Sequence, residues 1–256
     1  MKKLLFFALS IIIGFSTQAQ NKLDSKGQKT GHWEKNYKNG KLRYKGQFEK
    51  GYEVGEFTFY FPDGKKKSVM VFSEKGKKAA VRTYYKNGIQ QSTGAYYQKK
   101  KDGVWKFFDK NKKRVVKQEA YSKGIKHGAW KVYYPNGKVA TEIIWKNGER
   151  NGAWKEYFED GQLKLSATFL NDKMVGDYVS YFINKKISRR GRYIDGKQDG
   201  KWISYNDNGS YSDIIIYDKG YIRKETRYKN GKISLIRDNV NHTVKDFSKK
   251  DGSGEE

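Results

Sequence analysis

The chain has 256 residues, of which 32% are charged and only 36% hydrophobic, and its formal net charge at pH 7 is +26. It contains no cysteine, which excludes disulfides, a thiol nucleophile, a zinc–thiolate site and the lipidated cysteine of a lipoprotein. The small hydrophobic fraction favours a thin sheet with one solvated face over a deep core. The basic excess predicts attraction to polyanions such as membrane headgroups, acidic polysaccharide or nucleic acid.

Residues 1–19 have the pattern of a secretory signal peptide. Lys2 and Lys3 precede a mostly apolar run at 4–15, and the small residues at 16–19 form a cleavage region. The run is shorter than the roughly 20 residues of a membrane-spanning helix. We therefore expect export to the periplasm, the cell surface or the medium, with an uncleaved anchor as the alternative. Residues 20–30 read as a polar lead-in.

Residues 31–231 carry a repeat with a period of 24 or 25 residues. Each of eight units opens with a glycine, which is replaced once, at Ala79. A fixed period in this range predicts a repeat array. A second marker, usually aromatic, follows two residues after the opening position, and we expect these rings to stack one unit on the next. These repeat-stacking aromatics are Trp33, Phe57, Trp105, Trp130, Trp154, Tyr178 and Trp202.

Each unit reads as a β-hairpin. Tripeptides such as Lys-Asn-Gly at 38–40 and Pro-Asn-Gly at 135–137 suit short hairpin turns, and the runs between turns are rich in aromatic and β-branched residues. We expect Tyr44 and Phe48 to face one side of the second strand, and Arg43 and Lys45 the other. The prediction is an all-β, elongated array of about eight 24-residue antiparallel β-hairpins in a single-sheet solenoid. Residues 232–256 are expected to form a C-terminal cap and a disordered tail.

The pattern Gly-x-Trp-x-x-Tyr-Tyr-x-Asn-Gly-Lys at 128–138 resembles the MORN repeat, and more closely the bacterial MORN-variant repeat of YwqK-type, antitoxin-like proteins. The resemblance implies an elongated sheet of successive hairpins that serves as a scaffold, and some MORN arrays are credited with phospholipid binding. The chain departs from the pattern at Ala79 and Val81, and at Lys112 and Lys185 where a turn glycine is missing. Those units are expected to be looser or to have altered loops.

Basic residues share one face of the second strand in several units, and in-register stacking would align them into a stripe. The stripe predicts polyanion binding, and the alternative is a solvated face that resists edge-to-edge pairing. The aromatic rows have an alternative of their own, as stacking platforms for sugar rings. The residues predicted to bind polyanions are Lys41, Arg43, Lys45, Lys65, Lys67, Arg190 and Arg192.

No catalytic, cofactor-binding or metal-binding residues are predicted. His32 and His127 lie about four units apart, too far to share a metal, and both are expected in or beside turns. The sequence therefore predicts a non-enzymatic exported binding or scaffold protein for anionic envelope components, lipid or polysaccharide, or for a protein partner. An antitoxin-like protein that neutralises a partner protein is the alternative. Nucleic acid is disfavoured by the expected export, and a homo-oligomer stays open.

Overall fold

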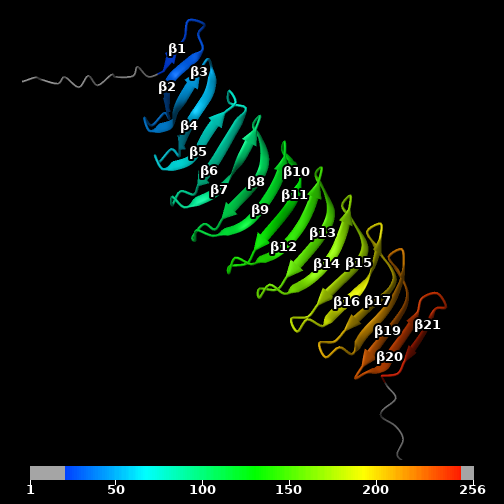
Figure 1. The fold of residues 1–256 in the computed structure, drawn as a ribbon. Helices are drawn as coiled ribbons and strands as arrows, with labels where there is room; N and C mark the ends of the chain where they lie inside the picture. The colour runs from blue at the N-terminus through cyan, green and yellow to red at the C-terminus, as the bar shows by residue number, and fades with distance from the viewer. Residues whose placement is uncertain (1–20, 249–256) are drawn as a thin grey trace, which may run out of the picture.

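The computed structural model describes residues 21–248, so the predicted signal peptide and the end of the predicted tail lie outside it. These residues form one antiparallel sheet of 21 strands, and neighbouring hairpins follow one another in chain order along a single axis (Figure 1). The predicted all-β hairpin array is confirmed. Within residues 21–248 no helix is long and apolar enough to cross a membrane.

Most units contribute two long strands, and the hairpin turns line the two long edges of the sheet (Figure 1). The strands are β1 (Lys22–Leu23), β2 (Lys29–Asn36), β3 (Leu42–Glu49), β4 (Tyr52–Tyr60), β5 (Lys66–Ser73), β6 (Lys78–Tyr84), β7 (Gln90–Tyr97), β8 (Lys100–Phe108), β9 (Val115–Ser122), β10 (Ile125–Lys126), β11 (Gly128–Tyr133), β12 (Val139–Lys146), β13 (Glu149–Tyr157), β14 (Leu163–Leu170), β15 (Lys173–Tyr181), β16 (Ile187–Ile194), β17 (Lys197–Tyr205), β18 (Tyr211–Asp218), β19 (Tyr221–Lys229), β20 (Lys232–Asp238) and β21 (Thr243–Asp246).

The opening glycine of a unit lies inside a strand and forms a bulge. Gly200 in β17 has a φ of +65°, a conformation that side chains with a Cβ rarely adopt. The pairing of β16 with β17 shifts around it, from Arg190–Ile203 to Arg192–Asp199. In the unit that has Ala79 instead of glycine, β5 and β6 pair without a shift. The departure from the repeat pattern therefore removes the bulge, and the loop before Ala79 is altered as expected, since residues 74–77 join β5 to β6 where only residues 50–51 join β3 to β4.

The two other departures concern turns. Lys185 adopts a φ of +66° in place of the missing glycine, and its backbone amide donates to Phe182 O at 3.0 Å as the turn glycines of other units do. At Lys112 the turn is one residue longer, and the Asp109 amide donates to Arg114 O at 2.9 Å. Of these two turns only the one at Lys112 is altered, and its extra residue accounts for the single 25-residue spacing.

Turns of successive units are joined in pairs by side-chain hydrogen bonds. Tyr134 Oη donates to Tyr157 O at 2.8 Å, Asn136 Nδ2 to Glu159 O at 2.8 Å, and Lys138 Nζ to Asp160 O at 2.6 Å. The same three bonds join Tyr37, Asn39 and Lys41 to the next turn. The tyrosine and asparagine bonds recur from Tyr85 and Asn87. The asparagine and lysine bonds recur from Asn184 and Lys186. The array therefore has a structural period of two units.

The largest buried side chains lie where one unit meets the next. Phe57, Trp105 and Trp202 are only 1–2% exposed, and each ring covers a glycine on the strand before it: Gly46, Gly94 and Gly191. A Cβ added to any of these glycines would overlap ring carbons. We name the sheet face that carries these rings the aromatic face. The missing Cβ of one unit thus makes room for the aromatic ring of the next.

The other predicted stacking aromatics contact further rings: the Tyr178–Trp202 pair spans a unit boundary as predicted, whereas the pairs that follow for Trp33, Trp130 and Trp154 lie within one unit. Ring centroids are 5.8 Å apart for Trp33 and Phe48, 5.2 Å for Trp130 and Trp145, 5.6 Å for Trp154 and Phe169, and 5.4 Å for Tyr178 and Trp202.

Short strands extend the sheet at both ends of the repeat array. At the N-terminal end the Trp33 indole donates to Lys22 O in β1 at 3.2 Å. The equivalent bond of Trp105 goes to Ala95 O of the preceding unit, at 3.0 Å. β1 therefore supplies to Trp33 the kind of carbonyl acceptor that a preceding unit supplies to Trp105. At the C-terminal end β20 and β21 continue the ladder to Asp246, so regular structure reaches beyond the predicted repeats and occupies part of the predicted cap and tail.

Candidate ligand-binding grooves

A groove of about 400 Å³ lies on the aromatic face near the N-terminal end, and we name it the basic groove. Tyr44 and Phe59 in its wall contact the Phe57 ring, with centroids 6.3 and 6.2 Å away. Three of its lining residues are cationic, four are aromatic and none is acidic. The lining residues are Lys35, Tyr37, Arg43, Tyr44, Phe59, Tyr60, Lys67, Ser68 and Met70.

A second bulge in each of the first two hairpins turns a basic residue toward this groove. Lys35 pairs with Tyr44 and Asn36 with Leu42, which leaves Arg43 without an opposite residue. Such an extra residue interrupts the alternation of the strand, and Arg43 lines the same groove as Tyr44. The prediction that Arg43 and Tyr44 face opposite sides is therefore wrong. Lys67 reaches the groove in the same way, because β4 and β5 shift between Phe59–Ser68 and Tyr60–Lys66.

The other predicted polyanion-binding residues are placed differently. Lys41 Nζ donates to Asp63 O at 3.1 Å in the next turn, and Lys45 lies on β3 opposite Glu34. Lys65 lines a neighbouring groove of about 410 Å³ together with Lys66 and Lys86. Arg190 lies 5.8 Å from the Tyr205 ring centroid, and Arg192 is paired with Asp177 and Asp199.

The predicted continuous stripe is not formed. At the position of Arg43, the middle units carry Gln91, Val116 and Ala140. Of the predicted residues, the structure brings together Arg43 and Lys67 in the basic groove, with Lys65 in the groove beside it.

Aromatic rings border the cations of the basic groove. The Arg43 guanidinium carbon lies 5.8 Å from the Tyr37 ring centroid, and Lys67 Nζ lies 6.0 Å from that of Phe61. Cations at this distance from a ring are attracted by its quadrupole. The groove can thus accept an anionic group against a wall with flat, partly apolar surfaces.

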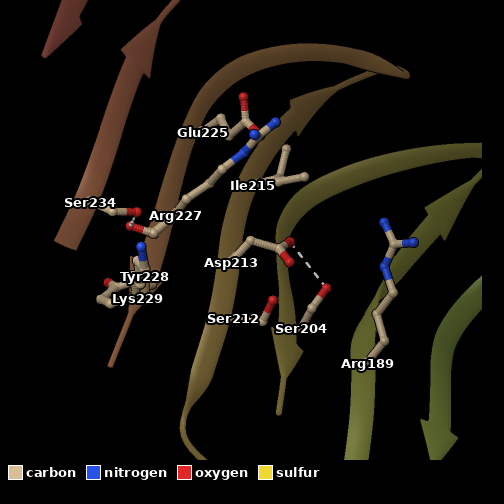
Figure 2. A pocket seen from close by; sticks show the side chains of 10 residues that line it. All are labelled: Arg189, Ser204, Ser212, Asp213, Ile215, Glu225, Arg227, Tyr228, Lys229 and Ser234. Atoms are coloured by element: carbon tan, nitrogen blue, oxygen red, sulfur yellow. Dashed lines mark hydrogen bonds and ion pairs between the residues drawn. The ribbon is translucent and has the colours of Figure 1, made fainter. Parts of the chain in front are cut away.

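A second groove, of about 570 Å³, lies near the C-terminal end, and we name it the mixed-charge groove (Figure 2). Sequence reasoning missed it because its charged residues come from separate strands. Glu225 is 6% exposed and pairs with Ile215, at the boundary where earlier units place an aromatic ring. Its carboxylate accepts from Arg227 Nε at 2.6 Å and from Arg237 Nη1 at 3.3 Å. The lining residues are Arg189, Ser204, Ser212, Asp213, Ile215, Glu225, Arg227, Tyr228, Lys229 and Ser234.

Glu119 is a second buried carboxylate on the aromatic face, only 5% exposed. Lys117 Nζ lies 2.7 Å and Lys101 Nζ 3.9 Å from its oxygens, and Tyr121 Oη donates to it at 2.7 Å. Burial by itself would raise the pKa of Glu119, but the hydrogen bonds from Lys117 and Tyr121 and the charges of both lysines outweigh burial and lower that pKa.

The lowered pKa predicts an acid-dependent loss of stability. Glu119 stabilises the fold above its usual pKa of 4.5, and this contribution is lost as the pH falls through the lower folded value. Glu119→Gln should therefore lower the free energy of unfolding near neutral pH, and the difference from the wild type should shrink in acid. Urea unfolding at about pH 7 and about pH 3 measures both values. An equal difference at both pH values would contradict this role.

Over residues 21–248, no three His, Asp or Glu side chains are grouped so that they could hold a metal ion. His32 lies within β2, not in a turn as expected, with Nε2 3.3 Å from Glu34 Oε1. His127 lies between β10 and β11.

Among solved structures, the crystal structure of an S. aureus TarM mutant in complex with fondaparinux, alpha-GlcNAc-glycerol and UDP is 18% identical to this chain. The match covers 42% of this chain and 21% of that one, with a TM-score of 0.27. Another TarM crystal structure is 19% identical, with the same coverage and TM-score. The crystal structure of TcdB2-TccC3-Cdc42 is 10% identical over 81% of this chain and 14% of that chain, with a TM-score of 0.20. Likenesses this weak carry no argument about shape or activity.

No curated protein matches the chain. The family described as MORN repeat variant matches residues 29–50, 53–74, 126–147 and 150–171. These are two pairs of adjacent units, and in both pairs the turns are joined by the full set of tyrosine, asparagine and lysine hydrogen bonds. The chain therefore contains MORN repeats of the variant type at these four positions.

Proposed function

We propose that this protein is an exported, non-enzymatic binding protein whose basic groove holds anionic groups of the cell envelope. MORN repeats suggest a repeat-type binding or scaffold protein. The observation that carries the ligand class is the lining of the basic groove, with Lys35, Arg43 and Lys67 among aromatic rings and no carboxylate. Export rests on the signal-peptide pattern of residues 1–19.

The chemistry of the groove favours phosphate, sulfate or carboxylate groups displayed on a surface or polymer. Its cations are at least partly exposed, so salt should screen their attraction over a Debye length of about 8 Å at physiological ionic strength. The neighbouring groove adds Lys65, Lys66 and Lys86. Two strands per unit place successive grooves roughly 10 Å apart, so an extended polyanion can contact both.

Charge reversal in the basic groove tests this function. Arg43→Glu combined with Lys67→Glu should weaken binding to phosphatidylglycerol vesicles at least about tenfold, since each basic residue near an anionic surface contributes roughly 1 kcal/mol. Co-sedimentation with phosphatidylglycerol and phosphatidylcholine vesicles across a salt series measures the effect. Dextran sulfate as a competitor distinguishes a lipid ligand from a polysaccharide.

A control with the same change in net charge is Lys146→Glu with Lys201→Glu, because both lysines are exposed and lie outside either groove. The control should bind nearly as the wild type does. Equal losses in the two double variants would show attraction to the net charge alone. Binding that ignores salt would also contradict the proposal.

A further inference from the structure

A row of polar side chains crosses four strands in the mixed-charge groove. Arg189 in β16 pairs with Ser204 in β17, Ser204 with Asp213 in β18, and Asp213 with Arg227 in β19. Directly paired residues share one face of a sheet, and neighbouring strands are about 4.8 Å apart. The row therefore presents a cation, a hydroxyl, a carboxylate and a second cation, and Figure 2 shows Asp213 between the two arginines.

The charges in this row do not neutralise one another. Asp213 accepts a hydrogen bond from Ser204 Oγ at 3.0 Å. Arg227 donates instead to Glu225, which also binds Arg237. In the described part of the chain, no ion pair within 4.0 Å joins Asp213 to Arg189 or to Arg227. An ionised carboxylate accepts several hydrogen bonds, so Asp213 has capacity left for a donor from outside the protein.

Arg189 is held ready for an acceptor. Its guanidinium lies 4.9 Å from the ring of Trp202, which is 1% exposed and therefore fixed. Its Nε atom is buried and has no hydrogen-bond acceptor among the residues that the structure describes. A buried donor without an acceptor is costly. A planar guanidinium can donate two parallel hydrogen bonds to a carboxylate, and the contact with the fixed Trp202 ring limits the positions that the Arg189 guanidinium can take.

We propose that the mixed-charge groove binds an acidic sugar residue. The sugar carboxylate would accept from Arg189, and its hydroxyls would donate to Asp213 and exchange hydrogen bonds with the groove serines. Asp213 disfavours an anion that has no donors of its own, and Arg189 disfavours a neutral sugar. The volume of about 570 Å³ is within the usual range of small-ligand pockets. This site is separate from the basic groove and does not depend on the proposed function.

Digalacturonate and its methyl ester test the assignment, because the ester keeps the hydroxyls and removes the charge. Titration of the wild-type chain with digalacturonate, followed by calorimetry, should be saturable, and binding should be at least about tenfold tighter than with the ester. Arg189→Gln and Asp213→Asn should each weaken digalacturonate binding about tenfold. Arg189→Lys keeps the positive charge but loses the two parallel N–H donors of the guanidinium, so this variant should also bind digalacturonate more weakly.

The two grooves can be told apart with matched variants. Arg43→Glu with Lys67→Glu should leave digalacturonate binding unchanged, and Asp213→Asn should leave vesicle binding unchanged. Equal affinity for acid and ester, or undiminished binding by Asp213→Asn with a native thermal transition, would overturn the proposal. Tighter binding of inorganic phosphate or of a free α-amino acid than of digalacturonate would overturn it too, since it would assign the groove to another ligand.

Discussion

Trp202→Ala is expected to lower the free energy of unfolding by about 3–5 kcal/mol, the usual cost of truncating a buried large aromatic residue. Trp202 is 1% exposed. Its ring centroid lies 5.0 Å from that of Tyr193 and 5.4 Å from that of Tyr178, and its indole donates to Arg192 O at 3.2 Å. The substitution removes contacts on both sides of a unit boundary. Denaturant unfolding followed by far-UV circular dichroism measures the loss.

Trp33→Ala is the matched control at the end of the array. Trp33 occupies the same place in the first unit, but it is only half-buried and has the two-residue β1 in place of a preceding unit. Stability in a repeat array is close to a sum of unit and nearest-neighbour terms. Trp33→Ala should therefore cost clearly less than Trp202→Ala. Equal losses would show that unit boundaries contribute alike wherever they lie and that burial of the ring is not decisive.

The hairpin array could be predicted from the sequence because its signals are short-range. Turn glycines such as Gly137, with a φ of +85°, mark the first turn of a unit. The period-two pattern of Leu163, Leu165, Ala167 and Phe169 is kept in β14, where the intervening residues are more exposed. Because the pattern recurs in eight units, a single departure from it, such as Ala79, does not obscure the period.

The composition of the grooves could not be predicted because it depends on register between strands. Arg43 follows period two in the sequence, but the bulge between Lys35 and Asn36 turns it toward the groove. The row from Arg189 to Arg227 is defined by three separate strand pairings. No spacing along the chain indicates it. The pairing of turns did leave a signal, since Tyr-x-Asn at 134–136 alternates with Phe-x-Asp at 158–160.

The sequence contains one further signal of the fold: a glycine lies eleven residues before a buried ring. It precedes Phe57, Trp105 and Trp202, at Gly46, Gly94 and Gly191. Where the later residue is Val81, its strand partner is the larger Met70. Ring and glycine therefore form a matched pair across each of these boundaries.

Gly191→Ala tests that match directly and is expected to cost about 1–3 kcal/mol or more, the range for overpacking a filled site. The added Cβ would overlap the indole of Trp202 at its Cδ2, Cε2 and Cγ atoms. The backbone of Gly191 is not in the left-handed region, so alanine suits its conformation and the cost is steric. Chemical denaturation of the single variant measures it.

A double-mutant cycle separates this steric cost from the loss of a flexible residue. Gly191→Ala should be much less destabilising in a Trp202→Val background, because valine at this boundary tolerates a larger partner, as Val81 tolerates Met70. Contacting residues couple by about 0.5–3 kcal/mol in such cycles, and the coupling here should favour the double variant. An alanine that costs the same beside tryptophan and beside valine would show that the glycine is not there for the ring. A double variant that is more stable than the two single losses predict would show that glycine and ring are matched to each other at the boundaries that carry this pair.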